Sequence, residues 1–318
     1  MTINSFPLYK IFILTSHNSI LLDKQINGTI GMDIIDDLMD ELIPLPPYLN
    51  GVCVNIELDI TVNMDTLYVG HYHSAETRFP VLSNGDSSYS LSNVLSYIRS
   101  KYLKLMIKSG NQCMPLIINF DVSQINKTQT NLLYECILTS LYNGNGNGNG
   151  NGHIHGIELN PGNKYCESIP LGQLKNKILI TGFKNDYFQH KLLPHIRIHM
   201  PNMKTLNYAF SYTMKKNIGK INRPYMIRIY PLMILGYDSK MILKQLLKPD
   251  NKVNMCAINF QHIDAENVKN IFRKMYNTSP CGRVYHHQST PIFYVNVVFF
   301  IMCILFYFIY IYINNNAS

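Results

Sequence analysis

Four short apolar runs in the first 121 residues each end in a polar residue that can bind a metal or transfer a proton. A buried parallel strand reads as a continuous run of Val, Ile and Leu, and the carboxyl ends of such strands are where a β/α barrel assembles its site. The residues that follow the four runs are His17 with Asn18, Glu57 with Asp59, His71 after Gly70, and Asp121. We therefore expect one converging site with two imidazoles, three carboxylates and an amide.

The rest of the chain alternates between strand-like and helix-like segments. Strands are predicted around 10–15, 52–59, 66–70, 115–121, 177–182, 206–210, 225–230, 253–260 and 283–285. Helices are predicted at 32–43, 91–108, 128–142, 239–247 and 264–276, where apolar residues recur at a spacing of three to four. This alternation indicates a parallel α/β fold, and a count of about eight strands favours a closed TIM-type (β/α)8 barrel.

Length and charge set broad limits on function. A chain of 318 residues with 47% hydrophobic residues accommodates a barrel of roughly 250 residues and an appendage. The net charge of +8 arises with only 15% charged residues, so it reflects few acids rather than basic tracts. A mildly basic surface or a weak attraction to an anionic membrane both explain this charge. No basic run is interleaved with aromatic residues, so we expect no nucleic-acid partner.

Cysteine usage and the termini indicate a compartment. The seven cysteines are scattered without a CxxC pair, which favours a reducing compartment. The first residues contain no secretory signal with a cleavage site. The repeat of Asn and Gly at 143–152 cannot bury apolar surface, so it is expected to be a flexible insert at a loop tip.

The C-terminal segment differs in kind from the rest of the chain. Residues 292–313 form a stretch of 22 residues without a charge, which is the length that a helix needs to cross a bilayer core. We therefore predict a transmembrane tail anchor at 291–313. Arg283 and the histidines that follow it lie on the N-terminal side of this segment, so the positive-inside rule leaves the main domain in the cytoplasm.

Nine short motifs occur in an order that is typical of one enzyme family. They lie at 16–18 (SHN), 54–59 (VNIELD), 70–71 (GH), 115–121 (PLIINFD), 174–180 (LKNKILI), 209–211 (AFS), 228–231 (RIYP), 257–261 (AINFQ) and 281–285 (CGRVY). With these motifs the chain resembles the catalytic core of eukaryotic-type phosphoinositide-specific phospholipase C. The resemblance implies an N-terminal half of the barrel at 1–186, a short linker at 187–204 and a C-terminal half at 205–288.

The resemblance also implies roles for individual residues. The implied Ca²⁺ ligands are Asn18, Glu57, Asp59 and Asp121, and oxygen ligands of this kind suit calcium. The implied catalytic residues are His17, which stabilises the transition state, His71, which protonates the leaving diacylglycerol oxygen, and Glu57 or Asp121 as the base. The implied headgroup-binding residues are Ser211, Arg228 and Tyr230. The expected reaction yields diacylglycerol and an inositol phosphate through a cyclic intermediate.

Two departures from the family pattern bear on metal binding and on substrate. Asp121 stands where the family has Glu, and the shorter side chain withdraws the carboxylate by roughly 1.5 Å. Thr181 and Phe183 stand where the family has two lysines that grip the ring phosphates. We therefore expect phosphatidylinositol with one ring phosphate or none to be accepted at least as well as the bisphosphorylated lipid.

The sequence leaves three candidate functions for the chain. The first is a calcium-dependent, tail-anchored phosphoinositide phospholipase C, which we expect to be monomeric. The second is a catalytically impaired barrel that binds inositol lipids or acts as a scaffold at a membrane, which the departures at Asp121, Thr181 and Phe183 favour. The third is a phosphodiesterase of glycerophosphodiesters, which explains the motifs at 228–231 and 257–261 poorly.

Overall fold

The structure is a computed structural model of the chain. It describes residues 3–17, 33–44, 51–63, 65–70, 90–123, 125–142, 166–183, 198–199, 226–229, 254–258 and 265–278. Two predicted strands (206–210 and 283–285), one predicted helix (239–247), the insert at 143–152 and the predicted anchor at 291–313 lie outside these residues. No helix within the described ranges is both long enough and apolar enough to cross a membrane.

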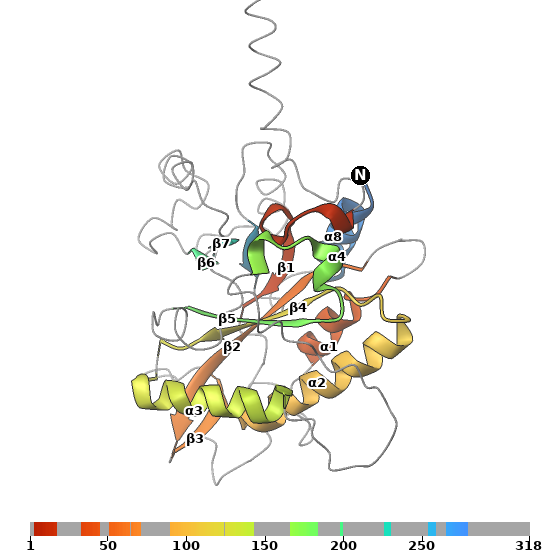
Figure 1. The fold of residues 1–318 in the computed structure, drawn as a ribbon. Coiled ribbons are helices and arrows are strands. Elements are labelled where there is room, and N and C mark those ends of the chain that lie inside the picture. Colours follow the sequence, from red (N-terminus) through yellow and green to blue (C-terminus); the bar gives the residue numbers. More distant parts are fainter. Residues whose placement is uncertain are drawn as a thin grey trace, which may run out of the picture.

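A parallel sheet forms the centre of the molecule (Figure 1). Its parallel strands are β1 (Ile13–Ser16), β2 (Val54–Asn63), β4 (Leu116–Asp121), β5 (Ile178–Phe183), β6 (Ile198–His199), β7 (Met226–Ile229) and β8 (Met255–Ile258). They pair in the order β5-β4-β2-β1-β8-β7-β6, and every one of these pairings is parallel. The two end strands, β5 and β6, also come into contact. The described strands therefore fit the α/β architecture of the expected barrel.

The continuous apolar runs are buried strands, as predicted. All six residues of β4 and all four residues of β1 are buried. Successive side chains of a strand point to opposite faces, so a strand that is buried throughout must be covered on both sides. One face of β2 and β4 carries apolar residues such as Ile56, Leu58 and Phe120, and all of them are fully buried. The other face carries the polar residues described below.

The strand at 66–70 pairs differently from the sequence prediction. We expected it to be a parallel strand like the other three, but β3 (Thr66–Val69) pairs antiparallel with the extended end of β2. The physical reason lies in the connection, because only two residues separate Asn63 from Thr66. A parallel pair needs a crossover of a dozen or more residues, whereas two residues suffice for a hairpin.

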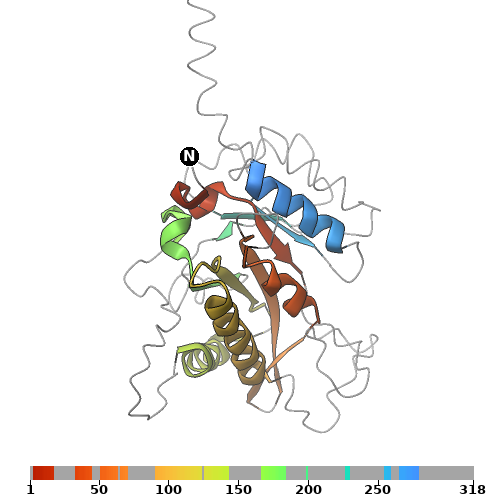
Figure 2. The same ribbon diagram turned by 90° about the vertical axis from the view of Figure 1, so that its right-hand side faces the viewer.

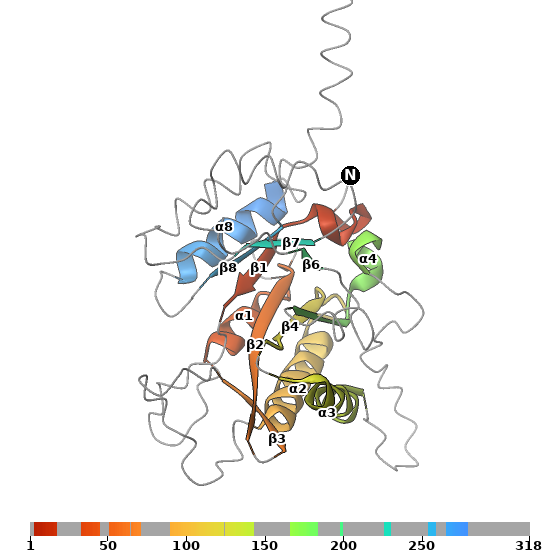
Figure 3. The same cartoon turned by 90° about the vertical axis from the view of Figure 1, so that its left-hand side faces the viewer.

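Helices cover the outside of the sheet. They are α1 (Asp33–Asp40), α2 (Leu91–Lys108), α3 (Lys127–Ile137), the short α4 (Leu171–Leu174) and α8 (Ala265–Thr278), and one π-helical turn at Leu138–Tyr142 extends α3. α2 packs against α1 and α3, whereas α8 lies along β8 and β1 (Figures 2 and 3). The helices predicted at 91–108, 128–142 and 264–276 are thus confirmed within one or two residues, apart from the π turn.

Local signals explain where the two long helices begin. Ser90 precedes α2, and its side chain accepts a hydrogen bond from the backbone N–H of Asn93. Asn126 and Gln129 form a reciprocal capping box at the start of α3. At the other end of α2, Gly110 adopts a left-handed backbone with φ of 59°, which glycine allows without a steric penalty.

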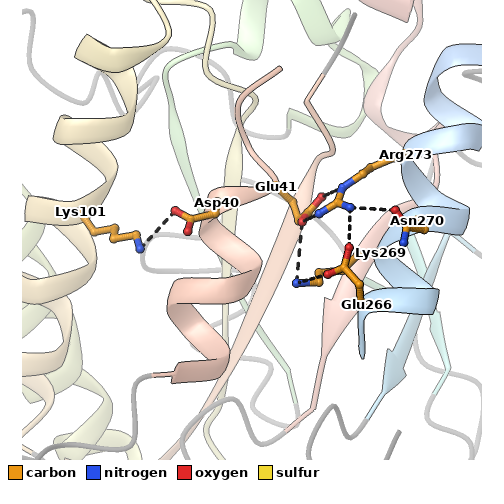
Figure 4. Close-up of polar contacts among 7 residues, drawn as sticks. All are labelled: Asp40, Glu41, Lys101, Glu266, Lys269, Asn270 and Arg273. Carbon is orange, nitrogen blue, oxygen red and sulfur yellow. Dashed lines mark hydrogen bonds and ion pairs between the residues drawn. The ribbon is translucent and has the colours of Figure 1, made fainter. Parts of the chain in front are cut away.

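An ionic cluster joins the first helix to the last (Figure 4). Glu41 follows α1 and accepts hydrogen bonds from the guanidinium of Arg273 on α8, and its other close cation is Lys269 at 4.0 Å. Glu266 lies 2.8 Å from Arg273 and 3.0 Å from Lys269. The cluster therefore connects the N-terminal half of the chain to its C-terminal half.

Candidate active site

The candidate site lies at the carboxyl ends of β1, β2 and β4. In the register of the sheet Glu57 is the neighbour of Asn119, and Asp59 is the neighbour of Asp121. His17 follows the last residue of β1. Residues that are neighbours in register share a face of the sheet, so these side chains lie on the same face, opposite to the face that packs on the helices. The structure thus brings His17 and Glu57 into contact and places Asp59 beside Asp121 in register.

The closest contact in the site joins His17 to Glu57. The Nδ1 atom of His17 lies 2.5 Å from Oε1 of Glu57, and Glu57 is fully buried while the His17 side chain is 13% exposed. An ionised carboxylate only accepts hydrogen bonds, so Nδ1 carries the proton and donates it. The contact engages Nδ1 and thereby orients the imidazole ring.

Asn119 is a member of the site that the sequence analysis missed. This residue on β4 is fully buried, and its amide Nδ2 donates to Oε2 of Glu57 at 3.2 Å. Both carboxylate oxygens of Glu57 therefore carry a hydrogen bond, one from each neighbouring strand. The signal was present in the apolar run that ends at Asp121, because an amide two residues before Asp121 must share its face.

The two aspartates lie one step further along the same strands. Asp59 is 7% exposed and Asp121 is 4% exposed. The backbone N–H of Ser123 donates to Oδ1 of Asp121 at 2.9 Å, so this carboxylate also shapes the turn after β4. Asp121 is not the N-cap of α3, because that position belongs to Asn126.

The face of the sheet that carries Glu57 also carries uncharged polar residues. Thr15 and Asn55 are neighbours in register and lie two residues before His17 and Glu57, respectively. Thr181 on β5 is the neighbour of Asn119, and Phe183 is the neighbour of Asp121. Thr15, Asn55 and Thr181 are fully buried. The position where the family has a lysine is thus a buried threonine within the site.

The remaining expected site residues are only partly covered by the structure. Asn18, His71, Ser211 and Tyr230 lie outside the described residues. The chain before His71 is placed, since the backbone N–H of Gly70 donates to the carbonyl oxygen of Asp59 at 2.8 Å. Arg228 is on β7, where its backbone is the register neighbour of Met255 on β8.

The expected calcium site is described only in part, because Asn18 lies outside the described residues. Within the described ranges, no three side chains from His, Cys, Asp and Glu are grouped so that they could hold a metal ion. What these residues do form is a buried His–Glu–Asn unit with two further carboxylates at its edge.

No protein-family model matches the chain, and no curated protein sequence matches it. Among solved structures, one that is similar is a mutant of the phosphatidylinositol-specific phospholipase C from Staphylococcus aureus. It has 11% sequence identity and a TM-score of 0.44, with 85% of this chain and 93% of that chain covered.

Proposed function

We propose that this chain is a phosphoinositide phospholipase C, a phosphodiesterase that cleaves the headgroup from phosphatidylinositol lipids. The observation that carries the proposal is the His17–Glu57 contact of 2.5 Å at the carboxyl ends of parallel strands. A buried carboxylate that holds one ring nitrogen of an imidazole fixes the orientation of the ring for chemistry on a phosphodiester. The order of the nine sequence motifs supports this enzyme class over other phosphodiesterases.

The proposed reaction proceeds by internal attack. The hydroxyl next to the phosphate on the inositol ring loses its proton to a base, and its oxygen forms a bond to phosphorus. The bond from phosphorus to the diacylglycerol oxygen breaks, and that oxygen takes a proton from His71. In its imidazolium form His17 donates from Nε2 to the phosphoryl oxygens while Nδ1–H donates to Glu57, and its charge stabilises the negative charge that develops there. Water then opens the cyclic inositol phosphate.

The base remains to be chosen between Glu57 and Asp121. Glu57 already accepts from His17 and Asn119, whereas the described hydrogen bond of Asp121 comes from a backbone N–H. The variants Glu57→Gln and Asp121→Asn separate the two roles. Replacing the base lowers kcat by about 10²- to 10⁴-fold and removes the lower limb of the pH–rate profile, whereas replacing the other carboxylate leaves that limb in place.

Calcium is a separate part of the proposal. The candidate ligands are Asn18, Glu57, Asp59 and Asp121, and a bound Ca²⁺ would neutralise phosphate charge and lower the pKa of the attacking hydroxyl. The chelator arm of the experiment below tests it independently of the histidines. Activity that survives the chelator would leave the His–Glu pair in place and remove calcium from the proposal.

We further propose that the apolar segment at 291–313 anchors the enzyme in a membrane with the barrel on the cytoplasmic side. The support is the charge-free length of the segment and the basic residues that precede it. An anchor of this kind would hold the site at the surface that contains its substrate. Alkaline carbonate extraction of membranes from cells that express the full chain tests the anchor.

The decisive experiment measures release of water-soluble inositol phosphate by the full chain in mixed micelles, with Ca²⁺ or with a chelator. We expect release from phosphatidylinositol, and a loss of about 10²-fold or more in His17→Ala. Asp40→Asn is the control, because Asp40 is exposed and lies on α1 away from the site. If the folded wild-type protein binds inositol lipid without any release, the second candidate, a membrane-anchored lipid-binding protein, replaces the enzyme.

A further inference from the structure

Asn119 is an unusual residue for its position. It lies in the middle of β4, where all residues are buried, and it follows Ile117 and Ile118. Its register neighbours are Glu57 on β2 and Thr181 on β5. A strand centre of this kind is normally filled by apolar residues, so an amide there requires a physical reason.

The packing alone does not supply that reason. Within the described residues the amide oxygen Oδ1 of Asn119 is buried and has no hydrogen-bond partner. A buried acceptor without a partner lowers stability, and an apolar residue of similar size would avoid that cost. The hydrogen bond that the described residues give to Asn119 runs from its Nδ2 to Oε2 of Glu57.

The geometry around Glu57 shows what this hydrogen bond achieves. The terminal torsion of a Glu side chain has a broad energy profile, so the side chain itself does not determine the plane of the carboxylate. Here His17 engages Oε1 from the β1 side and Asn119 engages Oε2 from the β4 side. Two donors on two different oxygens fix the plane of the carboxylate and therefore the direction in which Oε1 meets the imidazole.

We propose that Asn119 is a positioning residue, whose amide orients the Glu57 carboxylate toward Nδ1 of His17. Its effect on the rate rests on the proposed function, whereas its effect on the His17–Glu57 hydrogen bond does not. A displaced acceptor would leave the imidazole in a less defined orientation, and positioning errors of this size lower rates without changing the chemical groups.

The structure offers a matched control. Asn55 is also an asparagine, is also fully buried, and lies on the same face two residues before Glu57. Within the described residues neither its Oδ1 nor its Nδ2 has a hydrogen-bond partner, so its amide does not hold Glu57. Asn119→Leu and Asn55→Leu therefore remove the same group from the same buried face, and only one of them removes the contact.

The test combines a spectroscopic signature with kinetics on the full chain in detergent micelles. Histidine is labelled with ¹⁵N, and the low-field Nδ1–H proton resonance of His17 is assigned by its loss in His17→Gln. We expect Asn119→Leu and the isosteric Asn119→Asp to shift or broaden this resonance and to lower kcat about 10- to 100-fold with KM nearly unchanged. Asn55→Leu is expected to leave both the resonance and kcat as in wild type.

The outcomes separate this inference from the proposed function. An unchanged His17 resonance in folded Asn119→Leu overturns the positioning role, whatever the activity. Failure of both Asn119 variants to fold, while Asn55→Leu folds, overturns it in favour of a structural role. A wild-type protein that releases no inositol phosphate but shows the expected resonance changes refutes the proposed function and leaves the positioning role supported.

Discussion

At the scale of single residues, the site depends on how buried polar groups are paired. Glu57 is fully buried, and a buried carboxylate is costly unless charge and hydrogen bonds compensate for lost water. Its two donors, His17 and Asn119, provide that compensation. The same unit thus accounts for why the carboxylate is tolerated in the core and for how the imidazole is oriented.

Substrate preference is the property that the residue at position 181 should control. Thr181 is buried next to Asn119 in register, so a lysine there would add a cation beside the site, and Phe183→Lys would add a second one. We expect the double variant Thr181→Lys/Phe183→Lys to raise the ratio of bisphosphate to phosphatidylinositol cleavage about 10-fold, because charge-assisted contacts to phosphate are strong. Competition assays in mixed micelles measure this ratio, and an unaltered ratio contradicts the argument.

At the scale of the elements, the clearest stabilising interaction is the ion pair between Glu41, which follows α1, and Arg273 on α8. Glu41 is 3% exposed and is bound by Arg273 through two nitrogens (Figure 4). Fork-to-fork pairs of this kind combine charge with a defined geometry. The two residues are 232 positions apart, so the pair links segments that lie far apart in the sequence.

Removing the charge of Glu41 should therefore lower the stability of the folded protein. We expect Glu41→Gln to lower the free energy of unfolding by about 3 kcal/mol, because it takes the buried carboxylate away from Arg273 and Lys269 and leaves them only the exposed Glu266. Asp40→Asn is the matched control on the same turn, since Asp40 is 57% exposed and its pair with Lys101 contributes about 0.5 kcal/mol or less. Urea denaturation monitored by circular dichroism compares the two, and equal effects would contradict a buried role for the Glu41 pair.

The same cluster makes the stability of the protein depend on pH in the acidic range. Hydrogen bonds from Arg273, and then from Lys269, lower the pKa of Glu266 below its ordinary value of 4.5. A carboxyl group with a lowered pKa in the folded state stabilises the fold above pH 4.5 and loses that contribution as the pH falls through the folded pKa. We expect Glu266→Gln to flatten the decline in unfolding free energy below that pH. Urea curves from about pH 6 to about pH 3 test this, and parallel declines would contradict it.

At the scale of the whole molecule, the described cysteines report on packing. Cys53, Cys113, Cys136 and Cys166 are free thiols, as their scattered spacing suggested. Burial raises the pKa of Cys53, and it raises the pKa of Cys113 to about 12 and that of Cys166 to about 11. These thiols are therefore protonated and covered by the folded chain at neutral pH, which makes them poor nucleophiles.

Thiol labelling should thus follow unfolding. We expect Cys53, Cys113 and Cys166 to react with a thiol reagent at neutral pH only as fast as the chain opens, whereas the half-buried Cys136 reacts earlier. Mass spectrometry of the labelled peptides distinguishes the four sites. Rapid labelling of Cys53 or Cys113 in the native protein would contradict the described packing of β2 and β4.

The sequence by itself determined the features that are local. Apolar runs identified β1, β2, β4 and β5, and the recurrence of apolar residues at helical spacing located α2. The polar residues at the ends of those runs could also be identified from the sequence, so His17, Glu57, Asp59 and Asp121 were predicted to lie close together in one site. Their roles as calcium ligands remain predictions.

Only the tertiary structure decided what depends on which strands are neighbours. The register between β2 and β4 places Asn119 beside Glu57, and no periodicity within either segment contains that information. The ionic bond between Glu41 and Arg273 is likewise a contact between segments that lie far apart in the sequence. The sequence shows which polar side chains the chain contains. The distances between these side chains are set only when separate segments pack against one another.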